Sequence, residues 1–88
     1  KNMEEDLIKV VVFEHYNLIS KIEEVQTVEI GDPNCKLVNP YTVKTDGTLE
    51  PFLLDVTRDK EIMIGSDKII TIVEPTATLI EKYKDLID

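Results

Sequence analysis

The sequence predicts a small, mainly β domain that ends in one helix, and three observations lead to this fold class. Valine, isoleucine and threonine supply 28 of the 88 residues, beside a single alanine. These branched side chains are stiff and pack well on a pleated sheet. Apolar runs are short and regularly separated by turn residues, which is typical of a sandwich or barrel. Helical spacing of apolar side chains occurs near the C-terminus. At this length we expect one domain, residues 1–88.

Turn residues divide residues 7–73 into six expected strands. Asp46-Gly47 is the strongest hairpin signal, because a type I′ turn needs a positive φ at both central positions. Pro51 lacks an N–H and indicates a strand edge or a bulge. The expected strands are residues 7–13, 18–27, 35–44, 49–56, 61–64 and 68–73. The fourth and fifth can also be one strand that is broken at residues 57–60.

The last expected strand differs from the others because it is apolar on both faces. Ile70 and Ile72 point one way, whereas Ile69, Thr71 and Val73 point the other way. An antiparallel strand of this kind is buried on both sides. In so small a chain, we expect the second face of this strand to be covered by another subunit.

The C-terminal helix is expected over residues 76–87, after Pro75 ends the last strand. Thr78 and Glu81 have the spacing of a capping box, with Thr78 as the N-cap. Five apolar side chains form one helical stripe: Leu79, Ile80, Tyr83, Leu86 and Ile87. This stripe either covers the sheet or binds a partner.

Charge and size exclude several classes of protein. The net charge of −8 disfavours nucleic acid overall, so any phosphate contact has to be local. We expect no membrane span and no secretory signal, because the apolar runs are too short. The single cysteine favours a reducing compartment such as the cytoplasm. The chain is too short for a two-domain enzyme with an enclosed cofactor cleft.

Candidate chemistry is sparse, and we expect a protein that is not an enzyme and has no metal or cofactor. Cys35 and His15 would form a nucleophile–base pair only if the fold brought them together. Residues 55–61 resemble the start of a calcium loop, but Lys60 stands where glycine is needed and Ser66 where a bidentate glutamate is needed. Residues 65–68 are not a Walker loop and are expected to form a tight turn.

Residues 62–73, with Gly65 between two isoleucine-rich runs, resemble the second motif of the Sm/LSm family. A fainter first motif is formed by Phe13, Leu18, Ser20, Ile22 and Val25, with Ser20 in place of the usual glycine. As a whole, the chain is similar to uncharacterised Sm-like proteins of marine phage and cyanophage. The resemblance implies a small, strongly bent Sm-like (SH3-like) barrel of five to six strands, followed here by the C-terminal helix.

The family also implies a homo-oligomeric ring. In Sm-like proteins, the fourth and fifth strands pair with neighbouring subunits to close a ring of about five to seven copies, which is a head-to-tail contact. The interface residues that follow from this resemblance are Ile62, Ile64, Ile69, Ile70 and Ile72.

The family binds RNA at the ring pore, on loops that correspond here to residues 29–34 and 65–68. Ile64 stands where the family has the basic residue that holds a base. The candidate nucleic-acid-binding residues are therefore Asn34, Lys36, Gly65, Ser66, Asp67 and Lys68.

Two functions follow from these observations. The first is a non-enzymatic ring that binds single-stranded RNA or DNA, in the cytoplasm of a phage-infected bacterium. The second is a structural or adaptor module that oligomerises and binds protein. The fold favours the first, whereas the net charge of −8 favours the second.

Overall fold

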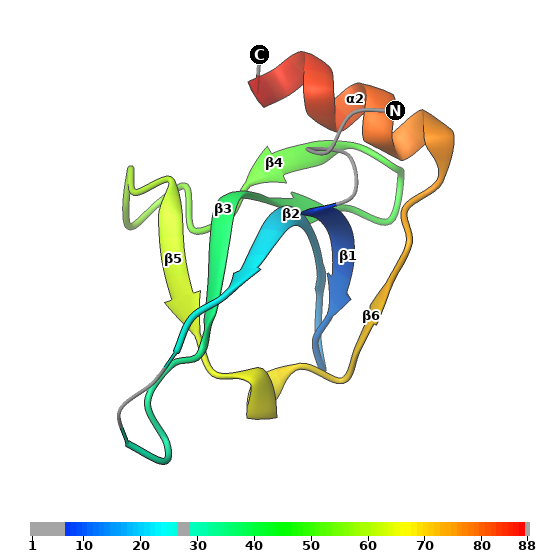
Figure 1. Cartoon of the computed structure of the whole chain (residues 1–88). Helices are drawn as coiled ribbons and strands as arrows, with labels where there is room; N and C mark the ends of the chain where they lie inside the picture. The colour runs from blue at the N-terminus through cyan, green and yellow to red at the C-terminus, as the bar shows by residue number, and fades with distance from the viewer. Residues whose placement is uncertain (1–6, 27–28, 88) are drawn as a thin grey trace.

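The computed structural model describes residues 7–26 and 29–87. Within these ranges the order of elements is β1 (Ile8–Val12), β2 (Asn17–Glu24), β3 (Cys35–Val43), β4 (Leu49–Pro51), β5 (Glu61–Ile64), the 3-10 turn η1 (Ser66–Lys68), β6 (Thr71–Val73) and the helix α2 (Ala77–Ile87). The mainly β class and the C-terminal helix are confirmed (Figure 1). The predicted extension of the second strand to Thr27 lies outside the described residues.

The described strands form one antiparallel sheet in the order β4-β3-β2-β1-β6, and β5 also pairs with β3. Two strands share the outer edge of β3: β5 pairs with its first half and β4 with its second half. Asn39 lies between these halves with a φ of 55°, a left-handed conformation that asparagine tolerates. The sheet is strongly bent but is not closed into a barrel. Closure would require β5 and β6 to pair with each other, whereas in the described residues they are only connected through η1.

Ser20 marks a second irregularity in the sheet. The register of β2 against β3 shifts between Ile19 and Lys21, which is the pattern of a β-bulge. The buried Ser20 hydroxyl lies 2.8 Å from the Lys21 carbonyl oxygen and 3.1 Å from that of Val38, so its donor is satisfied at the bulge. The strand is therefore irregular at Ser20, the residue that the expected Sm-like motif would replace with glycine.

Two apolar clusters occupy the two sides of the sheet. One contains Val11, Phe13, Leu18 and Leu37, with Ile22, Phe52, Ile64 and Ile69 packed against it. The other contains Ile8, Ile19 and Tyr83, with Leu79, Ile80 and Ile87 of α2 among its partners. The apolar stripe of α2 therefore covers the sheet of its own chain, which is the first of the two predicted roles of this stripe.

Two predictions about local structure are wrong in detail. The N-cap of α2 is Thr76 and not Thr78, because the Leu79 N–H donates to Thr76 Oγ1 at 3.2 Å. The helix begins at Ala77, so Thr78 already lies inside its first turn. The hairpin at residues 45–47 is also not type I′. Gly47 has a φ of 88°, whereas Asp46 is not among the residues with positive φ, as in a type I turn followed by a glycine bulge.

β4 and β6 are shorter than predicted, and both end at turns. β4 ends at Pro51, and Leu53 then adopts a φ of 58° in a tight turn closed by the Val56 and Thr57 N–H groups on its carbonyl oxygen. Lys68, the first residue of the predicted last strand, belongs to η1, and β6 begins only at Thr71. The residues lost from the two predicted strands include strand-forming side chains such as Phe52, Ile69 and Ile70.

Candidate functional site

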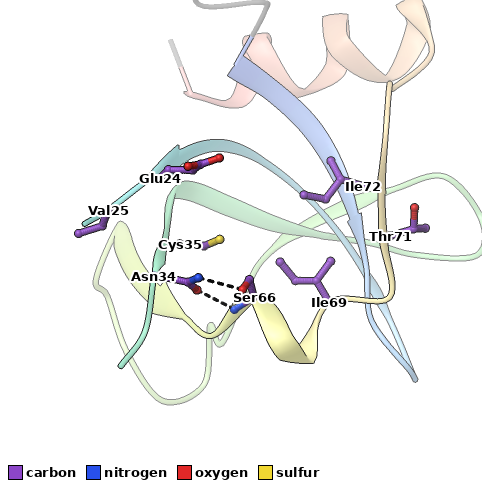
Figure 2. A pocket seen from close by; sticks show the side chains of 8 residues that line it. All are labelled: Glu24, Val25, Asn34, Cys35, Ser66, Ile69, Thr71 and Ile72. Carbon is purple, nitrogen blue, oxygen red and sulfur yellow. Dashed lines mark hydrogen bonds between the residues drawn. The ribbon is translucent and has the colours of Figure 1, made fainter. Parts of the chain in front are cut away.

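The structure brings the two loops that were predicted to line a pore into direct contact. The Asn34 side-chain amide donates from Nδ2 to Ser66 Oγ at 2.9 Å, and the Ser66 backbone N–H donates to Asn34 Oδ1 at 2.8 Å (Figure 2). The Asn34 N–H also donates to the Ile64 carbonyl oxygen at 3.2 Å. These bonds hold η1 against the start of β3, so residues far apart in the sequence form one polar corner.

η1 has the local bonds of a tight turn. The Lys68 N–H donates to the Gly65 carbonyl oxygen and the Ile69 N–H to that of Ser66, both at 3.1 Å. A Cβ atom on Gly65 would lie 2.5 Å from Asp67 Oδ1, so any larger residue would have to displace the Asp67 carboxylate. Asp67 is exposed and its carboxylate can rotate away, so the fold tolerates a small side chain at residue 65 at little cost.

A groove of about 570 Å³ opens beside this corner. Its lining combines polar and apolar side chains: Glu24, Val25, Asn34, Cys35, Ser66, Ile69, Thr71 and Ile72 (Figure 2). The volume falls within the range of small-ligand pockets. The charged side chain in this lining is the Glu24 carboxylate, which disfavours a phosphate inside the groove.

Cys35 is buried at the base of the groove, where Figure 2 shows its sulfur pointing inward. Burial raises the pKa of the Cys35 thiol, and the Glu24 carboxylate raises it further. A thiol with a raised pKa is neutral at physiological pH and is a poor nucleophile. His15 lies on the β1–β2 turn, where its Nε2 is 3.2 Å from Glu14 Oε1, and it lines a different hollow. The fold does not use these two residues as one site.

Lys36 differs from the other candidate residues because its charge is already paired. Its Nζ lies 3.4 Å from Glu23 Oε1 and 3.6 Å from Glu61 Oε1, on neighbouring strands to either side of β3. These carboxylates raise the pKa of Lys36, with the Glu23 hydrogen bond as the largest cause. In contrast, Lys68 is exposed and forms no ion pair within residues 7–26 and 29–87. Of the two candidate lysines, Lys68 is the one available to an incoming anion.

The predicted interface residues have two different environments. Ile64 and Ile69 pack against the core of their own chain, and Ile62 is half-buried. Ile70 and Ile72 are exposed to 65% and 44%. Two exposed residues on the same strands were missed by the sequence reasoning: Met63 on β5 (42%) and Val73 on β6 (45%). The alternation of side chains along β5 was the signal that would have identified Met63.

The described residues contain no cluster of three or more His, Cys, Asp or Glu side chains that could hold a metal ion. The calcium-loop resemblance at residues 55–61 therefore has no geometric counterpart there: Arg58 instead donates to the Leu54 carbonyl oxygen at 2.7 Å. In the described part of the chain, no helix has the length and apolarity that a membrane crossing requires.

The model of one protein family matches residues 6–88, nearly the whole chain. The chain belongs to DUF6561, a family of unknown function. A comparison with curated protein sequences gives no match.

Proposed function

We propose that this protein is a non-enzymatic module that assembles through the edges of β5 and β6 into a homo-oligomeric ring. The observation that supports this proposal most directly is the exposure of β6. All three of its residues are exposed, and Ile72 and Val73 retain 44% and 45% of their surface. In the described sheet, β6 pairs on one side with β1 and has no partner on the other side. An exposed apolar edge is a template for pairing with another chain.

The arrangement of the two edges favours a head-to-tail contact. β5 and β6 are the last strands on the two sides of the bent sheet, and they lie on opposite sides of the fold (Figure 1). A contact between unlike surfaces closes into a ring when the rotation between copies divides a full turn. The ring of about five to seven copies implied by the Sm resemblance has this form.

In this proposal the ring serves as a structural or adaptor module in the cytoplasm. The net charge of −8 on each copy gives the assembly a strongly acidic surface, which suits basic protein partners better than nucleic acid. The lone, buried Cys35 is compatible with a reducing compartment.

Multi-angle light scattering tests the assembly. We expect a discrete oligomer whose mass is a multiple of 10.1 kDa and changes little with salt, because the contact is largely apolar and strand-paired. Ile70→Asp should dissociate it, since the contact would bury a lone carboxylate. Ile30→Asp is the matched control, because Ile30 is fully exposed on a loop outside the proposed interface. A wild-type monomer throughout the micromolar range contradicts the proposal.

A second candidate function is the binding of single-stranded nucleic acid, and one observation favours it. The ammonium group of Lys68 has no ion-pair partner in the described structure, and it follows directly on the Asn34–Ser66 corner. A ring would repeat this cation once per subunit, which concentrates the charge around a pore. In the Sm-like resemblance, the expected pore loops correspond to the two loops of this corner.

Filter binding at two salt concentrations tests this second candidate, with oligo-U, oligo-A and single-stranded DNA as probes. Binding should weaken with salt at a slope of about −0.7 per phosphate contact. Lys68→Glu should abolish binding while the oligomer survives. Lys44→Glu is the control, since it makes the same change of charge on a hairpin where Lys44 is paired with Glu50 at 3.5 Å. No retention of any probe at low salt ends the nucleic-acid hypothesis.

A further inference from the structure

A small pocket lies in a notch on the outer edge of β3, where the two edge strands leave a gap between them. β5 pairs with the first half of β3 and β4 with the second half. Asn39 and Pro40 lie between the two ladders, and Pro40 has no N–H with which to bind a further strand residue. One hydrogen bond holds each side of the notch. The Asn39 N–H donates to the Lys60 carbonyl oxygen at 2.6 Å, and the Phe52 N–H donates to that of Pro40 at 3.0 Å.

The pocket in this notch, which we call the Arg58 pocket, has a volume of about 190 Å³ and combines apolar walls with charged groups. Its apolar side chains include Tyr41, Phe52 and Leu54, and its charged groups are Arg58, Asp59 and Lys60. Two cations and one carboxylate give the lining a net charge of +1, although the whole chain carries −8. The Arg58 pocket therefore attracts an anion locally, unlike the groove beside Glu24.

Arg58 is the single arginine of the chain, and the turn before it holds its guanidinium group in place. Arg58 Nη1 donates to the Leu54 carbonyl oxygen at 2.7 Å and lies 3.5 Å from the Thr57 carbonyl oxygen. The Nε and Nη2 atoms have no partner within residues 7–26 and 29–87. These two nitrogens form one edge of the guanidinium group, and such an edge can bind both oxygens of a carboxylate.

The turn that carries Arg58 is shaped before any ligand binds. Leu53 has a φ of 58°, and its carbonyl oxygen accepts the N–H groups of Val56 and Thr57, both at 3.0 Å. The Asp59 N–H donates to Thr57 Oγ1, also at 3.0 Å. Leucine rarely adopts a left-handed conformation, and strained residues of this kind collect at binding sites. Because the turn is already ordered, less conformational freedom is lost on binding.

The charge and the size of the Arg58 pocket limit what it can bind. Lys60 is exposed and forms no ion pair in the described ranges of the chain, so it is a second cation for an incoming anion. The net charge of +1 is balanced by one carboxylate, whereas a phosphate group carries about −1.5 to −2. The volume is smaller than the ~300 Å³ at which pockets for drug-sized ligands begin. The occupant is therefore a small acid or the end of a longer chain.

We propose that the Arg58 pocket binds a carboxylate attached to an apolar side chain. Arg58 Nε and Nη2 bind its two oxygens, and Lys60 supplies the second positive charge. The apolar part packs against Phe52 and Leu54. This chemistry has two sources, a free small monocarboxylic acid and the C-terminal residue of a protein chain. The pocket lies within one copy of the protein, so its failure would leave the proposed ring untouched.

An NMR titration of the full chain tests the class of ligand. The probes are N-acetyl-leucine, a short uncharged peptide that ends in leucine with a free carboxylate, and the same peptide with a C-terminal amide. We expect both acids to bind, and the amide to bind at least about tenfold more weakly. Equal affinity of the two acids shows that a free acid is sufficient, whereas tighter binding of the peptide identifies a chain terminus. No binding of either acid at millimolar concentration overturns the proposal, and so does an amide that binds as well as the acid.

The same titration locates the site without any substitution. We expect the backbone amide signals of Asn39, Phe52 and Lys60 to shift as ligand is added, and the Ser66 signal to stay in place. Ser66 lines the larger groove and serves as the internal control. Shifts that are confined to this groove would overturn the assignment to the Arg58 pocket.

Substitutions test the role of the guanidinium group. Arg58→Gln should weaken the binding of N-acetyl-leucine roughly tenfold. Arg58→Lys should recover only a small part of this loss, because an ammonium group cannot form the two parallel hydrogen bonds. Lys44→Gln removes the same charge from another hairpin and should keep wild-type affinity. Wild-type affinity in Arg58→Gln, or an equal loss in Lys44→Gln, contradicts the proposal. Circular dichroism checks the fold, and if Arg58→Gln misfolds, the wild-type shifts and the amide probe still decide the outcome.

Discussion

Tyr83 is the side chain that joins α2 to the sheet. It is fully buried, and its hydroxyl lies 2.8 Å from the Asn39 carbonyl oxygen and 3.1 Å from that of Val38. Its ring meets the ring of Tyr41 edge-on, with 5.8 Å between the centroids. Asn39 is the left-handed residue at which β3 changes partners, so one tyrosine ties the helix to the bend of the sheet.

Titration of the Tyr83 hydroxyl should lower the stability of the fold at alkaline pH. Burial raises the pKa of Tyr83 to about 12, above its value of about 10 in an unfolded chain. The folded state therefore holds this proton more tightly than the unfolded state does. The contribution of the phenol to the free energy of unfolding is complete below pH 10 and is lost as the pH rises toward 12. We expect the midpoint of urea unfolding to decrease in this window.

Tyr83→Phe is the control for this titration. The variant should lose about 1 kcal/mol at neutral pH, because the carbonyl oxygen of Asn39 loses a donor. It should also lose the part of the decline above pH 10 that comes from this phenol. An unchanged alkaline decline in the variant would assign the effect to other groups.

Ile64 is a residue at which the Sm-like resemblance expected from the sequence and the observed packing lead to opposite expectations. Sm-like proteins have a basic residue here, but the Ile64 side chain packs against the core cluster around Leu37. Ile64→Arg should therefore destabilise the fold, because a guanidinium group would enter an apolar cluster. We expect a lower thermal midpoint and no gain in nucleic-acid binding. Ile30→Arg, on an exposed loop, is the matched control and should leave the midpoint unchanged.

At the scale of elements, α2 is held by its N-cap and by the hairpin beneath it. Thr76 Oγ1 accepts the Leu79 N–H at 3.2 Å. Lys82 Nζ donates to the Gly47 carbonyl oxygen at 3.2 Å, so the helix is also attached to the β3–β4 turn. Within that turn, Asp46 Oδ1 accepts from the Thr48 hydroxyl and N–H, and these bonds lower the pKa of Asp46. The turn is thus held by its own hydrogen bonds as well as by its contact with the helix.

Thr76→Ala should lower the free energy of unfolding by about 1 kcal/mol, because the first turn of α2 loses an acceptor. Thr78→Ala should change it by a few tenths of a kcal/mol at most, since Thr78 is exposed and lies inside the helix. Chemical denaturation of both variants makes the comparison. A larger loss for Thr78→Ala would restore Thr78 as the cap.

At the scale of the whole molecule, the bent sheet has two exposed ends, β5 and β6. The Ile70 N–H donates to the Val12 carbonyl oxygen at 2.8 Å, on the side of β6 that pairs with β1. The Phe13 N–H donates to the Tyr16 carbonyl oxygen at 2.9 Å, so the backbone groups of Val11 face β2 and those of Val10 and Val12 face β6. Val10 lies opposite Val73 and Val12 opposite Thr71, so the N–H groups of Thr71 and Val73 point to β1 and that of Ile72 points to the free edge. The Ile72 amide has no strand partner in the described chain, and a neighbouring copy would provide one.

Hydrogen exchange measured by NMR distinguishes the two states of this amide. In the assembled protein, we expect slow exchange at Ile72. In the Ile70→Asp variant it should exchange rapidly, while the Thr71 and Val73 amides remain protected by β1. The Ile30→Asp variant should resemble the wild type. Rapid exchange at Ile72 in an intact oligomer would place the contact elsewhere on the molecule.

Local sequence determined the elements of this protein. Branched residues, short apolar runs and Gly or Pro at the breaks were enough to predict six strand segments along the chain and the C-terminal helix. The physical reason is that strand and helix spacing depend on neighbours along the chain. Asn34, Ser66 and Lys68 could be proposed from the loop positions, because small polar residues collect at turns.

Only the tertiary structure decided which side chains are free to act. Lys36 and Lys68 are equivalent in the sequence, yet the fold places Lys36 between two carboxylates on neighbouring strands and leaves Lys68 exposed. Ile64 and Ile70 belong to similar apolar runs, but one packs into the core and the other remains 65% exposed. These outcomes depend on strand register and on the bend of the sheet, which are set by contacts between segments far apart in the chain and not by any local pattern.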